Sequence, residues 1–298
     1  MKRHILYIIN PISGTKSKGS LQQLIEHKTK AAGFEYMVHS SIAGNDYSFL
    51  YDIVLEKKIT DVVIAGGDGT INGVVNAFKN LDVQFGILPF GSGNGLALTA
   101  GIPKNISSAL QIIFNGKSDL TDAFLVNNHF ACMLCGLGFD AQVAHDFAND
   151  PNRGLMTYIK QSVKNFFTAT PYPFKIKIAN EEFETEAFFI SIANSNQFGN
   201  NVTIAPKASI TDGLLDIVIV TKQNKFSVLL QTMRQVGGYN TLIEKEIANS
   251  NASIIYFQTE ALQIKNISLA PMHIDGDPVE AMKHLNIEVL HKSFRLIQ

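Results

Sequence analysis

A glycine-rich segment with one acidic residue holds residue types that bind phosphate: Gly66, Gly67, Asp68, Gly69, Thr70, Ile71 and Asn72. Residues without Cβ let the backbone approach an anion, and the free N–H groups at a helix start point towards it. That helix end also carries a partial charge of about +0.5. Phosphate repels Asp68 unless this carboxylate holds a metal ion or accepts a proton. Taken alone, the segment is also explained by a tight turn with a capping aspartate.

The flanking residues predict that this segment connects a strand to a helix. Residues 61–65 are apolar and rich in β-branched side chains, which is typical of a buried strand. Val74, Val75 and Phe78 then follow at the spacing of one helix face. This arrangement of strand, glycine-rich turn and helix favours phosphate binding over a plain turn.

Two further polar turns follow predicted strands. The apolar residues 5–9 end in Asn10 and Pro11, and residues 84–88 precede the Gly91-Ser92-Gly93-Asn94 turn. Neither turn is a Walker A loop, because no Lys-Ser or Lys-Thr pair follows the glycines, and neither is a dinucleotide fingerprint. Taken alone, the turn at 91–95 is explained equally well as structural.

Strand and helix patterns alternate through this part of the chain. A further strand is predicted at 34–39, and helices are predicted before Gly33, at 47–57 and before Gly116. The alternation predicts a doubly wound α/β domain with a mainly parallel sheet. Ligands bind outside the carboxyl ends of such strands, so we expect the three turns to share one site.

From about Ser118 onwards, strand patterns dominate. We expect strands at residues 120–126, 129–134, 174–178, 184–193, 214–221, 253–258, 262–266 and 285–290. Helical patterns interrupt them at 155–167 and 226–236. Several of these strands alternate polar and apolar residues, which predicts an antiparallel sheet domain of the sandwich type.

Composition narrows the functional class. The 298 residues have a formal net charge of −1 and no basic stripe, which argues against a nucleic-acid partner. The sequence contains no apolar run of membrane-spanning length and no signal-peptide pattern, so a cytoplasmic protein is expected. Cys132 and Cys135 fall in a predicted strand on opposite faces, which favours two structural thiols over a zinc or redox site.

Several motifs occur together in order: Asn10-Pro11-x-Ser13-Gly14, Gly66-Gly67-Asp68-Gly69-Thr70-x-Asn72, Gly91-Ser92-Gly93-Asn94, Gly138-Phe139-Asp140-Ala141, Asp212-Gly213-Leu214-Leu215-Asp216 and Asp275-Gly276-Asp277. This set resembles the diacylglycerol kinase and sphingosine kinase superfamily of lipid kinases, especially its soluble bacterial members. The resemblance runs nearly end to end. NAD kinases share the GGDGT segment but pair it with a downstream Asn-Glu dipeptide, which the corresponding region here lacks. NAD kinase is therefore the alternative.

The resemblance implies ATP bound between two domains and transfer of its γ-phosphate to a hydroxyl of a lipid such as diacylglycerol or a sphingoid base. The expected domains are an ATP-binding domain at 1–120 and a lipid-acceptor sandwich at 121–298, whose last strand can return to the first domain. On this basis Asn10, Ser41, Ser92 and the 66–72 turn would bind ATP. Asp68 would position Mg²⁺ and the phosphates. Ser209, Asp212 and Leu214 would supply oxygen ligands to a structural Mg²⁺, although a plain turn explains that loop nearly as well.

Asp277 is the residue that the resemblance assigns as the proton acceptor. The family usually has Glu there, one methylene longer, so Asp277 would act through a water molecule or on a shifted substrate. The composition of the 275–278 segment also allows it to be only a hairpin turn. Gly95 and Gly73 replace an Asp and a Glu that are frequent in the bacterial members, which leaves the acceptor open. Asp140 would contact the acceptor's polar head or cap a helix, with the cap slightly favoured.

A lipid substrate without a membrane anchor implies transient contact with the membrane surface. Phe166, Phe167, Tyr172 and Phe174 are candidates for this contact, although core packing is expected for most of them. The sequence leaves a homodimer open. A rival from another class is a nucleotide-binding regulatory protein without turnover, which the short Asp277 and the changed residue 95 motivate.

Overall fold

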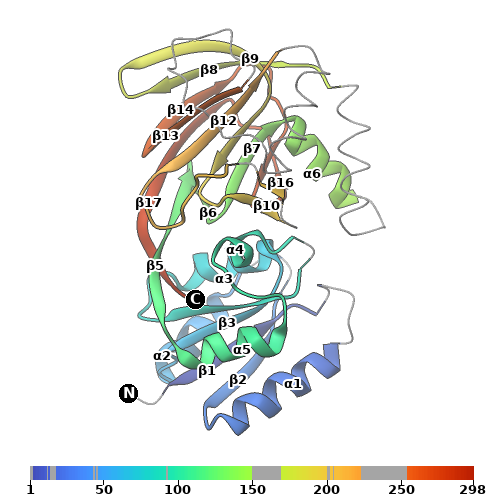
Figure 1. The fold of residues 1–298 in the computed structure, drawn as a ribbon, viewed down its shortest axis with the longest axis vertical. Helices are drawn as coiled ribbons and strands as arrows, with labels where there is room; N and C mark the ends of the chain where they lie inside the picture. Colours follow the sequence, from blue (N-terminus) through green and yellow to red (C-terminus); the bar gives the residue numbers. More distant parts are fainter. Residues whose placement is uncertain are drawn as a thin grey trace. The chain divides into compact units, whose positions relative to one another are not determined.

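The computed structural model describes residues 3–11, 13, 18–42, 44, 46–91, 93–149, 169–199, 202–203, 205–222 and 254–298. The chain forms two compact units, Met1–Thr121 together with Lys292–Gln298, and Asp122–His291 (Figure 1). The chain passes from one unit to the other within β5 (Ser118–Val126) and within β17 (His284–Ile297). No helix in the described part of the chain is long and apolar enough to cross a membrane.

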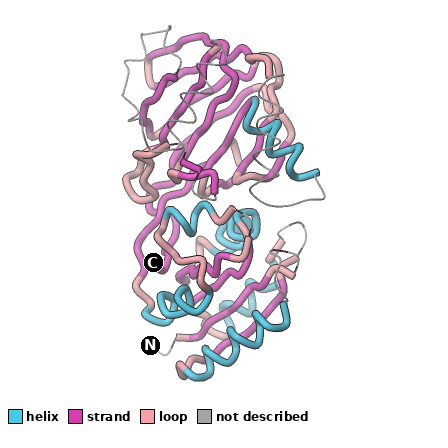
Figure 2. Tube along the Cα trace, turned by 45° about the vertical axis from the view of Figure 1, so that its right-hand side comes forward, coloured by secondary structure: helices cyan, strands magenta, loops and turns pink. Residues whose placement is uncertain are grey.

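The first unit is built on a parallel sheet. Its own strands pair in the order β4-β3-β1-β2, namely β4 (Gln84–Pro89), β3 (Asp61–Gly66), β1 (His4–Ile9) and β2 (Glu35–Ser40). The end of β17 pairs in parallel with β4. Figure 2 shows helices alongside these strands; they are α1 (Lys18–Ala31), η1 (Ser48–Leu50), α2 (Tyr51–Glu56), α3 (Asp68–Phe78), α4 (Gly95–Thr99) and α5 (Ile106–Asn115). The doubly wound α/β fold is confirmed.

The predicted helix faces form the core of this unit. In α3, Val74, Val75 and Phe78 are almost completely buried against the sheet. The helices α1 and α5 end where predicted, since Gly33 and Gly116 take the left-handed φ values of 76° and 66° that glycine tolerates after a helix. The pattern of apolar residues therefore predicted the buried faces, and the two glycines predicted the helix ends.

Arg3 organises the amino ends of the strands. Its guanidinium forms an ion pair with Asp61, which is completely buried, and donates to the carbonyl oxygens of Ile113 and Phe114 at 2.6 and 2.8 Å. The amide of Gln84 donates to the same carboxylate at 2.8 Å. The arrangement satisfies carbonyl groups at the end of α5 and neutralises a buried charge. This network lies at the edge opposite the glycine-rich turns.

The second unit consists mainly of antiparallel strands. Its main path runs in the order β16-β15-β7-β9-β8-β14-β17, with β12 pairing to β9 and β13. The further strands are β6 (His129–Ala131), β7 (Leu134–Gly138), β8 (Tyr172–Ile178), β9 (Glu181–Ala193), β10 (Gln197–Gly199), β11 (Val202–Thr203), β12 (Leu215–Thr221), β13 (Ile254–Thr259), β14 (Ala261–Asn266), β15 (Met272–Ile274) and β16 (Asp277–Val279). Inward-facing side chains such as Phe174, Ile190 and Ile264 build one core. The β-rich antiparallel sandwich is confirmed.

One predicted strand is wrong. Residues 129–134 form β6 and then bend before β7, because the backbone N–H groups of Cys132, Met133 and Leu134 point to the carboxylate of Asp275 instead of a neighbouring strand. Cys132 and Cys135 are buried free thiols.

Some sequence expectations fall outside the described residues. These are the helices predicted at 155–167 and 226–236, together with Phe166 and Phe167. Phe174 is completely buried, so it packs in the core and is not a membrane contact, whereas Tyr172 is half-buried.

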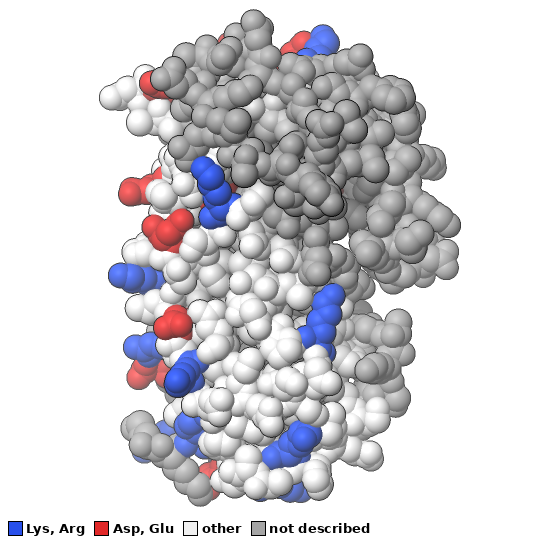
Figure 3. Space-filling view, viewed as in Figure 1, with Lys and Arg blue, Asp and Glu red and all other residues white. Residues whose placement is uncertain are grey.

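The described surface carries charges of both signs. On the face in Figure 3, lysine and arginine side chains are interspersed with aspartate and glutamate, and no continuous basic stripe appears among the described residues. Lys175 of β8, for example, pairs with Glu182 of β9 at 2.6 Å.

Candidate active site

The first polar turn is tied to the GGDGT segment. Asn10 follows β1, and its backbone N–H donates to the carbonyl of Ala65 in β3 at 2.9 Å. Its side-chain amide donates to the hydroxyl of Thr70 at 2.7 Å. Ser41 follows β2, and its N–H donates to the carbonyl of Ile9 at 2.8 Å. Asn10, Ser41 and Thr70 therefore lie at one edge of the sheet, as expected if the turns share one site.

The glycines at this edge allow two turns to touch. A Cβ on Gly67 would lie 3.2 Å from the Cα of Gly91, and one on Gly91 would run into the Cα of Gly67. A Cβ on Gly66 would lie 2.9 Å from the Cβ of Thr70. The N–H of Phe90 also donates to the carbonyl of Gly66 at 3.1 Å. Close backbone packing, which only glycine permits, joins the segment at 66–72 to the turn after β4.

The helix α3 starts within the GGDGT segment. Gly67 precedes it in an extended conformation, and Asp68 is its first residue and half-buried. Ile71 donates back to the carbonyl of Gly67 at 3.1 Å, while its side chain is fully buried. Helix geometry leaves the first N–H groups of α3 without an intrahelical acceptor. The segment thus aims backbone donors out of the sheet edge, with one carboxylate among them.

Asn94 shapes the third turn from within. It adopts a left-handed φ of 57° and is 4% exposed. Its Oδ1 accepts the N–H of Gly91, and its Nδ2 donates to the carbonyl of Gly91, both at 2.8 Å. The side-chain amide of Asn94 therefore closes the turn. Asparagine's tolerance of left-handed backbone was the available signal. Ser92 lies outside the described residues.

In the second unit, Asp277 follows a two-residue hairpin turn. The strands β15 and β16 pair with Ile274 opposite Asp277, and Asp275 and Gly276 between them have φ values of 50° and 87°. Two successive positive φ values mark the turn type that Asp-Gly favours. The hairpin interpretation of the sequence is therefore correct for the backbone, and it leaves the role of Asp277 open.

Asp275 is a structural residue that sequence reasoning missed. It is 4% exposed, and its carboxylate accepts the N–H groups of Cys132, Met133 and Leu134, each at 2.9 Å. The thiol of Cys132 also lies 3.3 Å from one of its oxygens. Charged hydrogen bonds of this kind are among the stronger ones in proteins. Asp275 therefore anchors the bend between β6 and β7 to the hairpin.

Asp277 is exposed at the start of β16, and neighbouring protein atoms shield its carboxyl group only in part. Partial desolvation raises the pKa of Asp277 above its ordinary value, and the negative charge of Asp275 raises it further. A carboxylate with a raised pKa is a stronger base than an ordinary aspartate. The side chain is chemically suited to accept a proton.

The predicted magnesium loop is a hydrogen-bonded turn. Asp212 accepts the N–H of Leu214 at 3.0 Å, and the hydroxyls of Ser209 and Thr211 lie 3.2 Å apart. The N–H of Gly213 donates to the buried carboxylate of Asp122 at 2.7 Å. Within the described part of the chain, no group of three acidic, histidine or cysteine side chains could hold a metal ion. The metal role of this loop stays a prediction.

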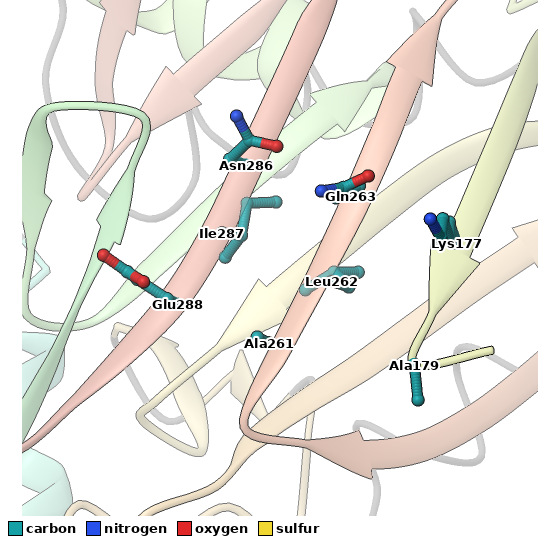
Figure 4. Close-up of a pocket in the computed structure, with 8 residues that line it drawn as sticks. All are labelled: Lys177, Ala179, Ala261, Leu262, Gln263, Asn286, Ile287 and Glu288. Atoms are coloured by element: carbon teal, nitrogen blue, oxygen red, sulfur yellow. The ribbon is translucent and has the colours of Figure 1, made fainter.

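A hollow of about 310 Å³ lies elsewhere in the second unit, over β8, β14 and β17 (Figure 4). Polar side chains such as Lys177, Gln263 and Glu288 line it. None of the residues proposed from the sequence takes part in it.

Comparison with known proteins adds matches along most of the chain. Residues 4–126 match the family model of the diacylglycerol kinase catalytic domain, and residues 134–298 match that of the YegS C-terminal NAD kinase beta sandwich-like domain. An uncharacterized protein of Synechocystis sp. is 30% identical over 240 residues, which span 76% of this chain and 54% of that relative. The diacylglycerol kinase of Bacillus subtilis is 25% identical over 284 residues, spanning 93% of this chain and 90% of that enzyme.

The fold is also found among solved structures. A crystal structure of a diacylglycerol kinase from Bacillus anthracis str. Sterne superposes with a TM-score of 0.74 at 20% identity, covering 99% of this chain and 96% of that one.

Proposed function

The chain belongs to the diacylglycerol kinase family of lipid kinases, and on that basis we propose that it uses ATP and Mg²⁺ to phosphorylate a hydroxyl group of a lipid such as diacylglycerol or a sphingoid base. The γ-phosphate of ATP is the group transferred. Phosphoryl transfer depends mainly on positioning and charge neutralisation. The sheet edge that would hold the phosphates therefore matters more for the reaction than any single side chain.

The observation that carries this proposal is the meeting of turns at the carboxyl edge of the first unit. Asn10 bonds to Thr70, and Gly67 packs on Gly91, which brings the turns after β1, β3 and β4 to one place. Asp68 stands at the start of α3 beside them. Backbone donors from a helix start, an amide and a hydroxyl suit the phosphates of ATP.

The residues at this edge also fit a magnesium ion. Mg²⁺ prefers oxygen ligands and is usually held by one or two carboxylates together with substrate phosphates. Asp68 would hold it, and the ion would neutralise negative charge on the phosphates during transfer. Asn10, the 66–72 segment, Ser41 and Ser92 would contact the nucleotide.

Asp277 takes the role of general base in this proposal. It would accept the proton of the lipid hydroxyl as the bond to phosphorus forms. Its raised pKa supports that role, because a base works best when its pKa approaches the operating pH. The lipid substrate requires transient contact of the protein with a membrane surface.

The test is transfer of labelled γ-phosphate from ATP with Mg²⁺ to lipids in mixed micelles. The panel contains diacylglycerol, sphingosine, ceramide, monoacylglycerol and phosphatidylglycerol, with NAD in a parallel reaction. We expect a labelled lipid with wild-type protein and a loss of about 10²–10⁴-fold with Asp277→Asn. Asp68→Asn should also abolish most of the transfer. Asp52→Asn, an exposed position on α2, is the matched control and should behave as wild type.

Each negative outcome has its own meaning. Phosphorylated NAD without a phosphorylated lipid would replace the proposal by an NAD kinase. Bound ATP with no labelled product in any reaction would contradict lipid transfer to this panel and favour a nucleotide-binding protein without turnover.

A further inference from the structure

Buried polar side chains lie on the face of the second sheet that α6 (Phe139–Asn149) covers. His273 of β15 pairs in register with Gly136 of β7, which in turn pairs with Ser191 of β9. The neighbours of these residues along each strand point into the sandwich core, so His273, Gly136 and Ser191 lie on the opposite face. His273 is 3% exposed and Ser191 is fully buried. Figure 1 shows α6 beside β7 and β16.

Asp140 of α6 fills the space above Gly136. It is 5% exposed, and its Oδ1 accepts the N–H of Ala141 at 2.8 Å. Its Oδ2 lies 3.6 Å from Nε2 of His273 and has no hydrogen-bond partner among the described residues. A Cβ on Gly136 would run into both this oxygen and this nitrogen. The glycine therefore makes room for a buried carboxylate–imidazole pair, and Asp140 lies within the first turn of α6, after its first residue.

The other ring nitrogen of His273 reaches the hairpin turn. The N–H of Gly276 donates to Nδ1 at 3.3 Å. Because a backbone N–H can only donate, Nδ1 carries no proton, and the neutral imidazole carries its proton on Nε2, facing Asp140. Gly276 immediately precedes Asp277. A chain of contacts thus runs from Asp140 through the imidazole to the backbone beside the carboxylate.

We propose that His273 is a positioning residue for Asp277, and that Asp140 holds its imidazole in the tautomer that this requires. The proposal rests on the proposed kinase function, in which Asp277 takes the proton. Asp277 is one methylene shorter than the Glu usual in this family, so its reach depends more strongly on where the backbone places it. A displacement of about 1 Å is enough to cost about 10²-fold in rate. The bond from Gly276 to His273 restrains that backbone.

Two substitutions of His273 separate its two contacts. His273→Asn keeps an acceptor at the position of Nδ1 and loses the group that faces Asp140. His273→Gln keeps a donor near the position of Nε2 and loses the acceptor for Gly276. We expect kcat to fall by about 10²-fold in His273→Gln with both KM values unchanged, and His273→Asn to recover most of the kcat. Ser191→Ala is the matched control, because Ser191 is buried on the same face of the sheet and its hydroxyl has no hydrogen-bond partner among the described residues.

Asp140→Asn tests the tautomer directly. Its amide keeps Oδ1 for Ala141 but turns a donor towards Nε2, which favours the tautomer with the proton on Nδ1 and removes the bond from Gly276. Nitrogen-15 NMR of the imidazole should show this exchange of protonated nitrogen, and kcat should fall as in His273→Gln. The double variant with His273→Gln should be no slower than either single variant, because both remove the same contact.

The outcomes distinguish this proposal from the proposed function. A tautomer change in Asp140→Asn with unaltered kcat would overturn the positioning role, while transfer that still requires Asp277 would leave the kinase function intact. An equal loss of kcat in His273→Asn and His273→Gln would also overturn the positioning role. So would a rise in KM with kcat unchanged. Transfer at the wild-type rate by Asp277→Asn would instead show that Asp277 is not the base.

Discussion

Replacing Asp275 should destabilise the second unit far more than the same change at Asp277, two residues away. Asp275→Asn keeps one oxygen, which can still accept the N–H groups of Met133 and Leu134 that Oδ1 accepts now. The second oxygen becomes an NH₂ group that faces the N–H of Cys132, so two donors meet. One buried donor is then unsatisfied, and two charged hydrogen bonds become neutral.

The structure sets the expected magnitude. A buried donor without a partner costs about 1–3 kcal/mol, and hydrogen bonds to a charged group are worth about 1.5–3 kcal/mol against about 1 for neutral ones. We therefore expect Asp275→Asn to lower the free energy of unfolding by about 2–4 kcal/mol. Asp275→Ala leaves all three donors unsatisfied and should cost more than about 4 kcal/mol. Total stabilities of about 5–15 kcal/mol make both changes large.

The assay is guanidinium-induced unfolding followed by circular dichroism. Asp277→Asn is the matched control, because it makes the same chemical change in the same hairpin. A destabilisation by Asp275→Asn below about 1 kcal/mol, or one equal to that of Asp277→Asn, would refute the assignment of Asp275 as the anchor of the bend.

Three further predictions follow from other contacts. Gly91→Ala would push the turn off Gly67, so ATP affinity, measured by calorimetry, should fall while the thermal midpoint of the second unit stays unchanged. Arg3→Ala leaves Asp61 buried without its cation, so chemical unfolding should show a loss of about 3–5 kcal/mol. The pKa of Asp277 is raised in the native state, so the native state disfavours its ionised form and loses stability as the pH rises above the ordinary aspartate range. Asp277→Asn should therefore be more stable than wild type at pH 7 and equal to it below that range, and the acid limb of the wild-type kcat/KM profile should lie above that range.

The sequence predicted those parts of the fold that depend on local patterns. The strand at 61–65, the apolar face with Val74 and Phe78, and the end of a helix at Gly116 each depend on neighbouring residues alone. Asn10 and the GGDGT segment were also correctly expected at one sheet edge, because parallel strands end together.

Contacts between distant segments could not be predicted from such patterns. The bend at 132–133 is caused by Asp275, which lies more than 140 residues further on, and no local pattern reports it. The buried pair of His273 and Asp140 forms only because Gly136 leaves space between two strands and a helix. An aspartate next to a glycine, as at Asp275-Gly276, is a weak signal for a contact between distant segments, since a hairpin turn explains it equally well.

We propose that this chain transfers phosphate from ATP to a lipid hydroxyl with Asp277 as the base. Single-turnover transfer of labelled γ-phosphate to the best lipid of the panel, with ATP binding measured on the same samples, tests it most directly. We expect Asp277→Asn to bind ATP as wild type does and to transfer phosphate about 10²–10⁴-fold more slowly. Transfer by Asp277→Asn at the wild-type rate, or no lipid phosphorylated by the wild type while ATP is bound, would contradict it.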